Sequence, residues 1–160
     1  MAQQSLIVRI DDRLIHGQVL VGWGNHYSIK RIVVGNDEIA DNEWEKNLLL
    51  MAVAAPMEAQ VLSLEETLAF THAHIQAPDL SMVLLASPLD LARMAENGLQ
   101  WKQINLGGIH YEEGRRQFLP YLFLSDREIT LFRRLMKEGF RFECQDVPGS
   151  NRYNLEKVLG

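Results

Sequence analysis

The sequence has only one cysteine, Cys144, among its 160 residues. One cysteine cannot form a disulfide within the chain, so the fold does not rest on a disulfide framework and a reducing compartment is favoured. We expect Cys144 to be a small buried side chain near the end of a strand. The N-terminus lacks the basic segment and apolar run of a signal peptide, and no apolar stretch is long enough to span a membrane. These absences predict a cytoplasmic protein that meets a membrane only through a partner.

An excess of basic residues is also missing, since the formal net charge is -5. Broad affinity for nucleic acid or for anionic lipid requires a basic surface, so neither partner is expected. A small local basic site for a phosphate group is still compatible with this balance. The composition, 47% hydrophobic and 23% charged, is that of a globular protein, and the length favours one domain over residues 1–160.

Short apolar runs alternate along the chain with segments that carry helix signals. Near-continuous apolar runs, typical of strands that are buried on both faces, occupy residues 6–10, 31–34, 60–62, 82–85 and 104–106. Serines suited to cap helix N-termini and glycines suited to end helices are Ser63, Ser87, Ser125, Gly98 and Gly139. This alternation predicts an α/β fold, an open and mainly parallel β-sheet with helices on both faces.

The last third of the chain is expected to add two strands and a helix. Residues 118–124 read as one strand, which Pro120 places at an edge or a bulge because proline cannot donate to a sheet. Residues 140–145 are a candidate for the last strand, and residues 151–159 for a short closing helix.

Polar residues gather directly after the first predicted strand, in residues 9–18 (RIDDRLIHGQ). In open α/β sheets, ligands bind beyond the carboxyl ends of the strands. The apolar residues after this segment predict a helix, whose N-terminus favours an anion. Arg9 and Arg13 can donate to phosphate oxygens. Asp11 can hold one ring nitrogen of His16 and leave the other free to attack phosphorus.

A purely structural role fits the same segment, because aspartates often cap helices and Arg–Asp pairs are common on surfaces. No glycine-rich phosphate loop follows the first strand, and no Cys/His spacing resembles a zinc site, so no metal is expected. His26 is expected near a helix C-terminus, while His72 and His74 are too close in sequence to share a helix face. His110 follows another strand and either lines the same crevice as His16 or has no role.

The chain resembles a known family from end to end. Residues 9–19 closely resemble the active-site segment of the IIB components of mannose/fructose/sorbose-class phosphoenolpyruvate-dependent sugar phosphotransferase systems. Further segments that resemble this family are residues 31–40, 54–56, 105–108, 139–143 and 147–148. The resemblance implies a mainly parallel sheet with helices on both faces and one antiparallel strand, which agrees with the fold predicted from the helix signals.

The resemblance also implies a function, that of a protein-N(π)-phosphohistidine–sugar phosphotransferase. A IIB component takes a phosphoryl group from a phosphohistidine on a IIA protein or domain. It passes the group to a sugar that the membrane components IIC and IID transport. By this analogy His16 is phosphorylated on Nδ1, and Arg13 and Asp11 complete the catalytic set. The residues expected to bind phosphate are Arg9, Gly17 and Ser87, and those expected to line the crevice are Asn105, Gly108 and His110. No cofactor is implied.

Two loops depart from the family pattern, at Ala86-Ser87 and at Ile109-His110, where the family commonly has a Phe-x-Asn-Pro-like loop and a methionine. These departures affect the choice of partner and sugar and leave the phosphoryl-accepting loop intact. Two other functions stay open: a regulatory phosphoprotein that uses His16 without sugar transport, and a small-molecule-binding domain without transfer activity. A homo-oligomer is also possible, and would be indicated by an exposed apolar helix face.

Overall fold

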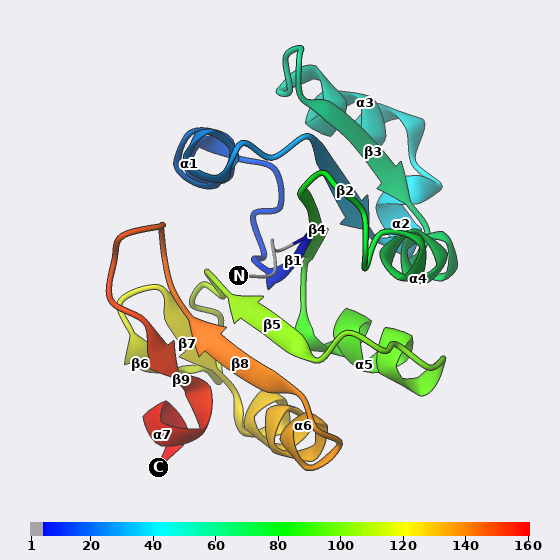
Figure 1. The fold of residues 1–160 in the computed structure, drawn as a ribbon. Helices are drawn as coiled ribbons and strands as arrows, with labels where there is room; N and C mark the ends of the chain where they lie inside the picture. Colours follow the sequence, from blue (N-terminus) through cyan, green and yellow to red (C-terminus); the bar gives the residue numbers. More distant parts are fainter. Residues whose placement is uncertain (1–4) are drawn as a thin grey trace.

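The computed structural model describes residues 5–160, which form a seven-stranded sheet with the strand order β3-β2-β4-β1-β5-β8-β9 (Figure 1). The strands of this sheet are β1 (Leu6–Ile10), β2 (Arg31–Gly35), β3 (Glu58–Leu62), β4 (Ser81–Leu85), β5 (Gln103–Leu106), β8 (Arg141–Cys144) and β9 (Tyr153–Asn154). Neighbouring strands pair in parallel except β8 and β9, which are antiparallel. The predicted α/β architecture with one antiparallel strand is confirmed.

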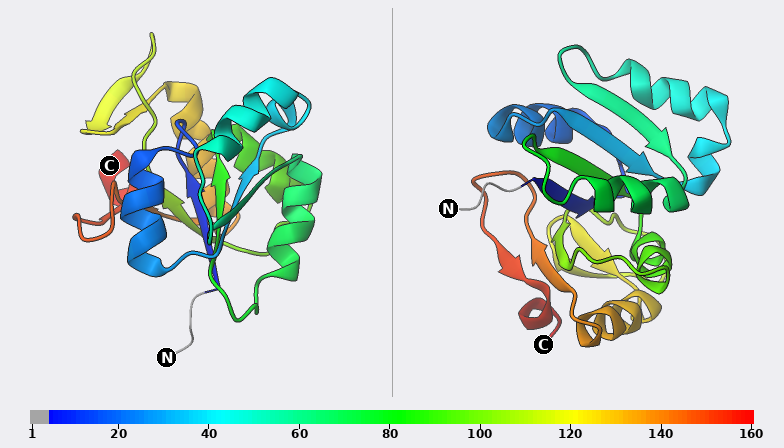
Figure 2. Two further views of the ribbon diagram at one scale, coloured as in Figure 1. Left: turned by 90° about the horizontal axis from the view of Figure 1, so that it is seen from above. Right: turned by 45° about the vertical axis from the view of Figure 1, so that its right-hand side comes forward.

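Helices cover both faces of the sheet, as the left view of Figure 2 shows with the blue segment after β1 on one side and the green α4 on the other. The helices are η1 (Gln18–Gly24), α1 (Asn25–Tyr27), α2 (Asp37–Ala40), α3 (Glu43–Met51), α4 (Leu64–Ala73), α5 (Pro88–Glu96), α6 (Asp126–Lys137) and α7 (Leu155–Leu159). Because side chains alternate along a strand, each face of the sheet contributes to its own core. Ile7 and Met82 pack with Val19 and Trp23 of η1. Val8 and its neighbours pack with α5 and α6 on the other face.

The five strands predicted from apolar runs and the predicted helix caps are confirmed. All five apolar runs lie within strands β1 to β5, and β1 and β4 are fully buried. The side chains of Ser63, Ser87 and Ser125 each accept a hydrogen bond from the first turn of α4, α5 or α6. Gly98 and Gly139 adopt positive φ values of 92° and 100° just after helices, a conformation that favours glycine. Cys144 ends β8 and is buried, as predicted.

The prediction of one strand over residues 118–124 is wrong. This segment belongs to a separate antiparallel hairpin of β6 (Arg116–Leu119) and β7 (Leu122–Leu124), with an irregularity in register between Gln117 and Leu119. Pro120 lies in the turn, where its missing N–H breaks no ladder hydrogen bond. The closing segment is also more divided than predicted, because β9 precedes the short helix α7, whose N-terminus Asn154 caps.

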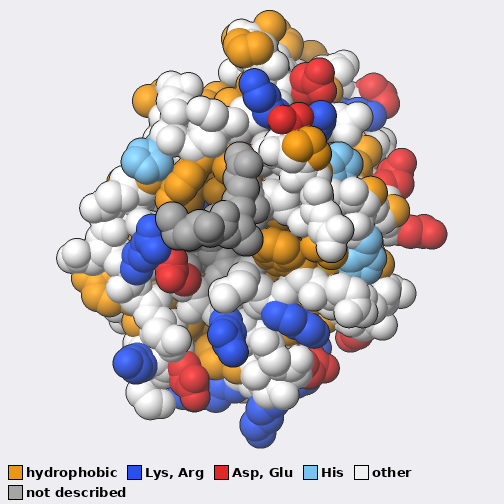
Figure 3. Space-filling view, in the orientation of Figure 1, with side chains coloured by type: hydrophobic (Ala, Val, Ile, Leu, Met, Phe, Trp, Pro, Cys, Tyr) orange, Lys and Arg blue, Asp and Glu red, His pale blue; other side chains and the backbone are white. Residues whose placement is uncertain are grey.

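Charged side chains of both signs are mixed on the face that Figure 3 shows, and the basic ones form no continuous patch there. Among the described residues, no helix combines the length and apolar character needed to cross a bilayer.

Candidate functional site

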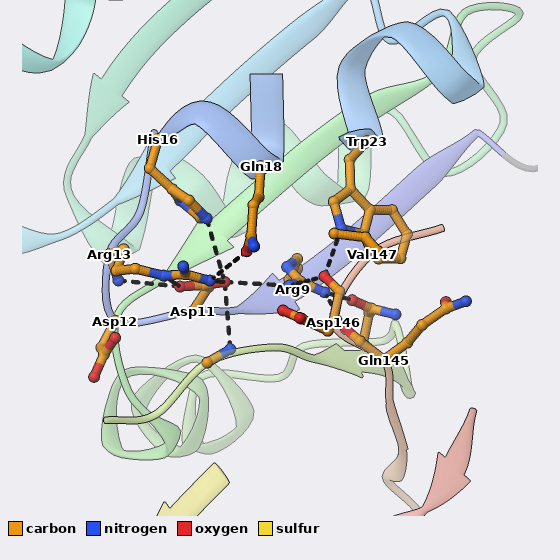
Figure 4. A network of polar contacts seen from close by, with 12 residues as sticks. Arg9, Asp11, Asp12, Arg13, His16, Gln18, Trp23, Gln145, Asp146 and Val147 are labelled. Atoms are coloured by element: carbon orange, nitrogen blue, oxygen red, sulfur yellow. Dashed lines mark hydrogen bonds and ion pairs between the residues drawn. The ribbon is translucent and has the colours of Figure 1, made fainter. Parts of the chain in front are cut away.

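The buried carboxylate of Asp11 is the centre of the site at the carboxyl end of β1 (Figure 4). Its Oδ1 accepts hydrogen bonds from the backbone N–H of Arg13 at 3.1 Å and from Arg13 Nε at 3.2 Å. Its Oδ2 accepts from Arg9 Nη2 and Arg13 Nη2, each at 3.2 Å, and from the Gly108 amide at 3.3 Å. Asp11 therefore joins two strands and two arginines into one rigid unit.

The two buried charges of this unit influence each other's ionisation. Burial by itself opposes ionisation of Asp11, but the hydrogen bonds from Arg13 and the charge of Arg9 outweigh it and lower the pKa of the carboxyl. Burial lowers the pKa of the Arg9 guanidinium, and the nearby Asp11 opposes that change. Since arginine stays protonated in proteins, the unit contains a carboxylate held between two guanidinium groups at neutral pH.

The side chain of Arg9 is fully buried beneath the loop of His16 and supports the site from inside the protein. Its Nη1 donates to Asn105 Oδ1 and to the Gln145 carbonyl, and its Nη2 also donates to the Asp146 carbonyl at 2.9 Å. The guanidinium also lies 4.7 Å from the centre of the Trp23 ring. The predicted direct contact of Arg9 with phosphate does not fit this geometry, since protein acceptors occupy its terminal nitrogens. Arg9 instead holds Asp11 in place.

His16 leans over this unit with only 16% of its side chain exposed. Its Nδ1 lies 2.7 Å from the Leu14 carbonyl oxygen, so Nδ1 carries a proton and donates it there. Its Nε2 is buried with no hydrogen-bond partner among residues 5–160, 3.9 Å from Asp11 Oδ2. Leu14 reaches this position with φ of 57°, a left-handed conformation that a side-chain-bearing residue adopts at a cost of about 1–3 kcal/mol. The prediction that Asp11 holds one ring nitrogen of His16 is therefore wrong for this arrangement: Leu14 fixes the tautomer, and Asp11 only faces the other nitrogen.

A helical segment begins directly after His16, as predicted, but residues 18–24 of it form a π-helix. The Leu20 amide donates to the His16 carbonyl, while the amides of Gly17 and Gln18 donate to no acceptor among residues 5–160. π-helical turns are rare and occur often at functional sites. Gln18 accepts a hydrogen bond from Arg13 Nη2 at 3.0 Å. The free amides and the partly exposed Arg13 therefore border the same space beside His16.

The remaining predicted site residues divide into two groups. Asn105, Gly108 and His110 lie at the carboxyl end of β5 and contact Arg9, Asp11 and Asp12 respectively, so the structure brings them to this site. Ser87 instead caps α5 by accepting from the Asp90 amide at 3.3 Å, and among the described contacts none joins it to the loop of His16. Its predicted contact with phosphate has no support in this arrangement.

Sequence reasoning missed several residues that hold the site together: Gly107, Gln18, Trp23, Gln145 and Asp146. A Cβ on Gly107 would overlap the Arg9 guanidinium, so only glycine fits there. The Gly107-Gly108 pair was a usable sequence signal for this close approach. Trp23 Nε1 donates to the Asp146 carbonyl at 3.2 Å, a backbone contact that no side-chain pattern reveals.

The other histidines lie away from this site. His26 is exposed and meets the Tyr27 ring edge to face at 4.7 Å between ring centres. His72 is exposed near the end of α4, and its Nε2 accepts from the Gln100 amide at 3.1 Å. His74 stacks on Phe70, with 3.9 Å between ring centres.

Comparison with known proteins gives one consistent result. Residues 5–160 match the family described as the PTS system sorbose subfamily IIB component. The chain is 32% identical over 156 residues to the sorbose-specific EIIB component of Klebsiella pneumoniae, covering 97% of this chain and 95% of that protein. It is 30% identical over 141 residues to the mannose-specific EIIAB component of Escherichia coli strain K12, covering 88% of this chain and 44% of that protein.

Solved structures agree with the sequence comparison. The crystal structure of the IIBSor domain of the sorbose permease from Klebsiella pneumoniae superposes with a TM-score of 0.85 at 30% identity, covering 97% of this chain and 96% of that one. The expected α/β fold is thus the fold of this group of proteins. The chain belongs to the sorbose subfamily of IIB components of the phosphotransferase system, a family of phosphotransferases in sugar uptake.

Proposed function

We propose that this chain accepts a phosphoryl group on His16 from a phosphohistidine of a IIA protein and passes it to a sugar that IIC and IID transport. The observation that carries this proposal is the position of His16 over the Asp11–Arg13 pair, beside free backbone amides at the start of a helix. Membership in the sorbose subfamily of IIB components supports it. So does the name EIIAB of the Escherichia coli relative, which joins the letters of both components.

The transfer is an in-line displacement between two imidazoles. A lone pair on a ring nitrogen of His16 attacks phosphorus, the P–N bond to the donor histidine breaks, and its electron pair returns to the donor ring. The phosphoryl group moves as a unit, so this step needs positioning and charge stabilisation more than a strong base. In the next step a sugar hydroxyl attacks phosphorus, the P–N bond to His16 breaks, and the hydroxyl proton leaves to solvent or to the membrane partner.

Arg13 is the residue best placed to hold the moving group. Its side chain is 32% exposed, and Asp11 fixes its guanidinium through two hydrogen bonds. A guanidinium held in this way needs little reorganisation when it donates to the phosphoryl oxygens. The amides of Gly17 and Gln18 can donate to the same group, and Asp11 acts by orienting Arg13 and His16 rather than by contacting phosphate.

The choice of ring nitrogen links the loop to the reaction. Phosphorylation on Nδ1, the nitrogen implied by the family resemblance, requires the hydrogen bond from Nδ1 to the Leu14 carbonyl to break and the Nδ1 proton to leave. The neutral ring then carries its proton on Nε2, 3.9 Å from Asp11 Oδ2, and Nδ1 has the lone pair that attacks phosphorus. Release of the hydrogen bond to the Leu14 carbonyl frees a loop residue held in a left-handed conformation. A rotation of the His16 ring accompanied by relaxation of Leu14 therefore precedes or accompanies transfer.

The decisive experiment is incubation of the chain with labelled phosphoenolpyruvate, enzyme I, HPr and a matching IIA protein. We expect acid-labile, base-stable label on the wild type and none on His16→Ala. His72→Ala, which removes an exposed histidine of α4, serves as the matched control and should be labelled normally. Label on His16→Ala, or none on the wild type, would refute the proposal.

A second variant tests the role of Arg13. Arg13→Ala should slow phosphoryl transfer by about 100-fold, in the range found when one preorganised donor of a transition state is removed. Its free energy of unfolding should change by less than about 1.5 kcal/mol, because the side chain is partly exposed and Arg9 still pairs with Asp11. Transfer at the wild-type rate would show that Arg13 does not hold the phosphoryl group.

The acceptor side is tested by adding membranes that contain the IIC and IID components. Appearance of a sugar phosphate, with loss of label from His16, supports transport. Stable label with no transfer to any sugar would favour the regulatory phosphoprotein instead.

A further inference from the structure

A second histidine, His110, lies beside the proposed phosphoryl site and is held by a carboxylate of the same loop. His110 Nδ1 lies 2.6 Å from Asp12 Oδ1, and the His110 amide donates to Asp12 Oδ2 at 2.8 Å. Asp12 in turn donates its own amide to the Gly108 carbonyl at 2.9 Å. These three bonds tie the loop after β5 to the loop after β1 and fix the ring of His110.

The loop that carries His110 is anchored on its far side as well. Arg115 Nη1 donates to the His110 carbonyl at 2.7 Å, and the rest of that guanidinium pairs with Glu128 at 2.9 and 3.0 Å. The backbone of Ile109 bonds to Tyr121 and Phe123 in the β6–β7 hairpin. His110 is therefore a positioned side chain, although 49% of it is exposed.

Gly108 allows His110 and Arg13 to lie close together. A Cβ placed on Gly108 would lie 3.0 Å from His110 Cε1 and 3.3 Å from Arg13 Nη2, both tighter than ordinary contacts. Both side chains therefore pack against the Gly108 backbone and are neighbours of each other. The Gly108 amide also donates to Asp11 Oδ2, the oxygen nearest to His16 Nε2. His110 and Arg13 accordingly adjoin the unit over which His16 lies.

The charges of the site leave a need for another cation. Arg9 and Arg13 are balanced by Asp11 and Asp12, so these four side chains carry no net charge before transfer. A phosphoryl group brings a charge of about -1.5 to -2. Arg9 is buried and bonded to protein acceptors, so Arg13 faces this added charge without a second cation from β1 or its loop.

We propose that His110, oriented by Asp12 and packed beside Arg13, is a second phosphate-contacting residue that donates from Nε2 to a phosphoryl oxygen during transfer to and from His16. The inference rests on the proposed phosphocarrier function. With Nδ1 directed at Asp12, only the protonated ring has an Nε2–H to donate. His110 moves no proton in the reaction and forms no covalent bond. Its contribution is greatest where histidine is protonated and decreases as pH rises.

Two substitutions separate contact with phosphate from a structural role. Asn at position 110 can still donate to Asp12 but has no group at the position of Nε2. Gln can place its amide nearer to that position while losing the fit to Asp12. The test is to measure single-turnover transfer from phosphorylated IIA to this chain between about pH 5.5 and pH 8.5, with thermal unfolding of each variant in parallel. The matched control is His72→Ala.

The expected results follow from the half-exposed position of His110. At about pH 6, His110→Asn should lower the transfer rate constant about 10-fold, less than the roughly 100-fold cost of a fully buried donor. His110→Gln should recover part of this loss. Its advantage in rate constant over His110→Asn should not decrease as pH rises. The ratio of wild type to His110→Asn should fall toward one at high pH. This ratio isolates the contribution of His110, because every other residue is the same in both proteins.

The other charged groups near His110 are Asp12, Arg13 and Arg115, with Glu112 and Glu128 paired to Arg115, and all of them are retained in both variants. Gly108→Ala adds an independent test, because its methyl group would press on His110 and Arg13 without removing a charge and should also slow transfer about 10-fold. Wild-type transfer by His110→Asn at about pH 6, or an equal loss at every pH, would overturn the inference while His16 is still labelled. An unlabelled wild type would instead refute the proposed function itself.

Discussion

Removal of the Asp11 charge should destabilise the fold more than loss of any exposed acidic residue. In Asp11→Asn, the buried Arg9 guanidinium loses the carboxylate that accepts from its Nη2 at 3.2 Å, and Arg13 loses the same partner. Breaking a buried ion pair by removing one partner costs about 3–5 kcal/mol. For a chain of this length that corresponds to a decrease in Tm of about 10 °C. The assay is urea and thermal unfolding at neutral pH.

The pH dependence of the same variant gives the sharper test. The folded-state pKa of Asp11 is lowered, so its contribution to stability is present above the unfolded-state value of about 3.9 and is lost as pH falls through the folded-state value. The difference between wild type and Asp11→Asn should therefore be constant above about pH 5 and shrink in more acidic solution.

The matched control for this test is Asp79→Asn. This substitution breaks a partly exposed pair with Arg31 at 3.6 Å and should cost at most about 1 kcal/mol. Equal stability of wild type and Asp11→Asn at neutral pH would refute the view that Asp11 anchors the site.

Three further predictions test the close packing around the site. Gly107→Ala should lower the free energy of unfolding by about 3 kcal/mol in urea, because its Cβ would overlap Arg9, whereas Gly17→Ala, with no atom within 4 Å, should be neutral. Burial raises the pKa of the Cys144 thiol to about 12, so iodoacetamide should modify it only after unfolding, and rapid modification of the folded chain would contradict its placement. Neutral His16 should carry its proton on Nδ1 in ¹⁵N NMR spectra, since the Leu14 carbonyl accepts there, and an Nε2–H form would contradict that contact.

The elements that the sequence predicted correctly are those decided by nearby residues. β1 and β4 are buried throughout and mostly apolar, and the capping boxes at Ser63 and Ser125 need only the residue three positions later. The hairpin of β6 and β7 was misjudged as one strand because Phe118 and Leu122 continue the apolar pattern across Pro120. The proline was the correct signal, and it marked a turn rather than a bulge.

The position of Arg9 shows why a site is harder to predict than a strand. Its sequence neighbours made it a candidate for contact with phosphate, but its partners are Asn105, the carbonyls of Gln145 and Asp146, and the Trp23 ring. Two of these partners are backbone groups more than a hundred residues away, so they carry no side-chain pattern. Only the assembled sheet shows that Arg9 points under the loop, away from solvent.

The site has a buried part and a partly exposed part. Arg9, Asp11 and Gly107 are buried and mutually packed, while Arg13, His16 and His110 are partly exposed, and each of these three is tied to a carboxylate or a carbonyl. Asp11 bonds both to Arg13 and to the Gly108 amide, and Arg9 bonds both to Asp11 and to Asn105 of β5. Under the proposed function, the buried arginine would therefore act on transfer indirectly, by holding the loops after β1 and β5 in a fixed arrangement.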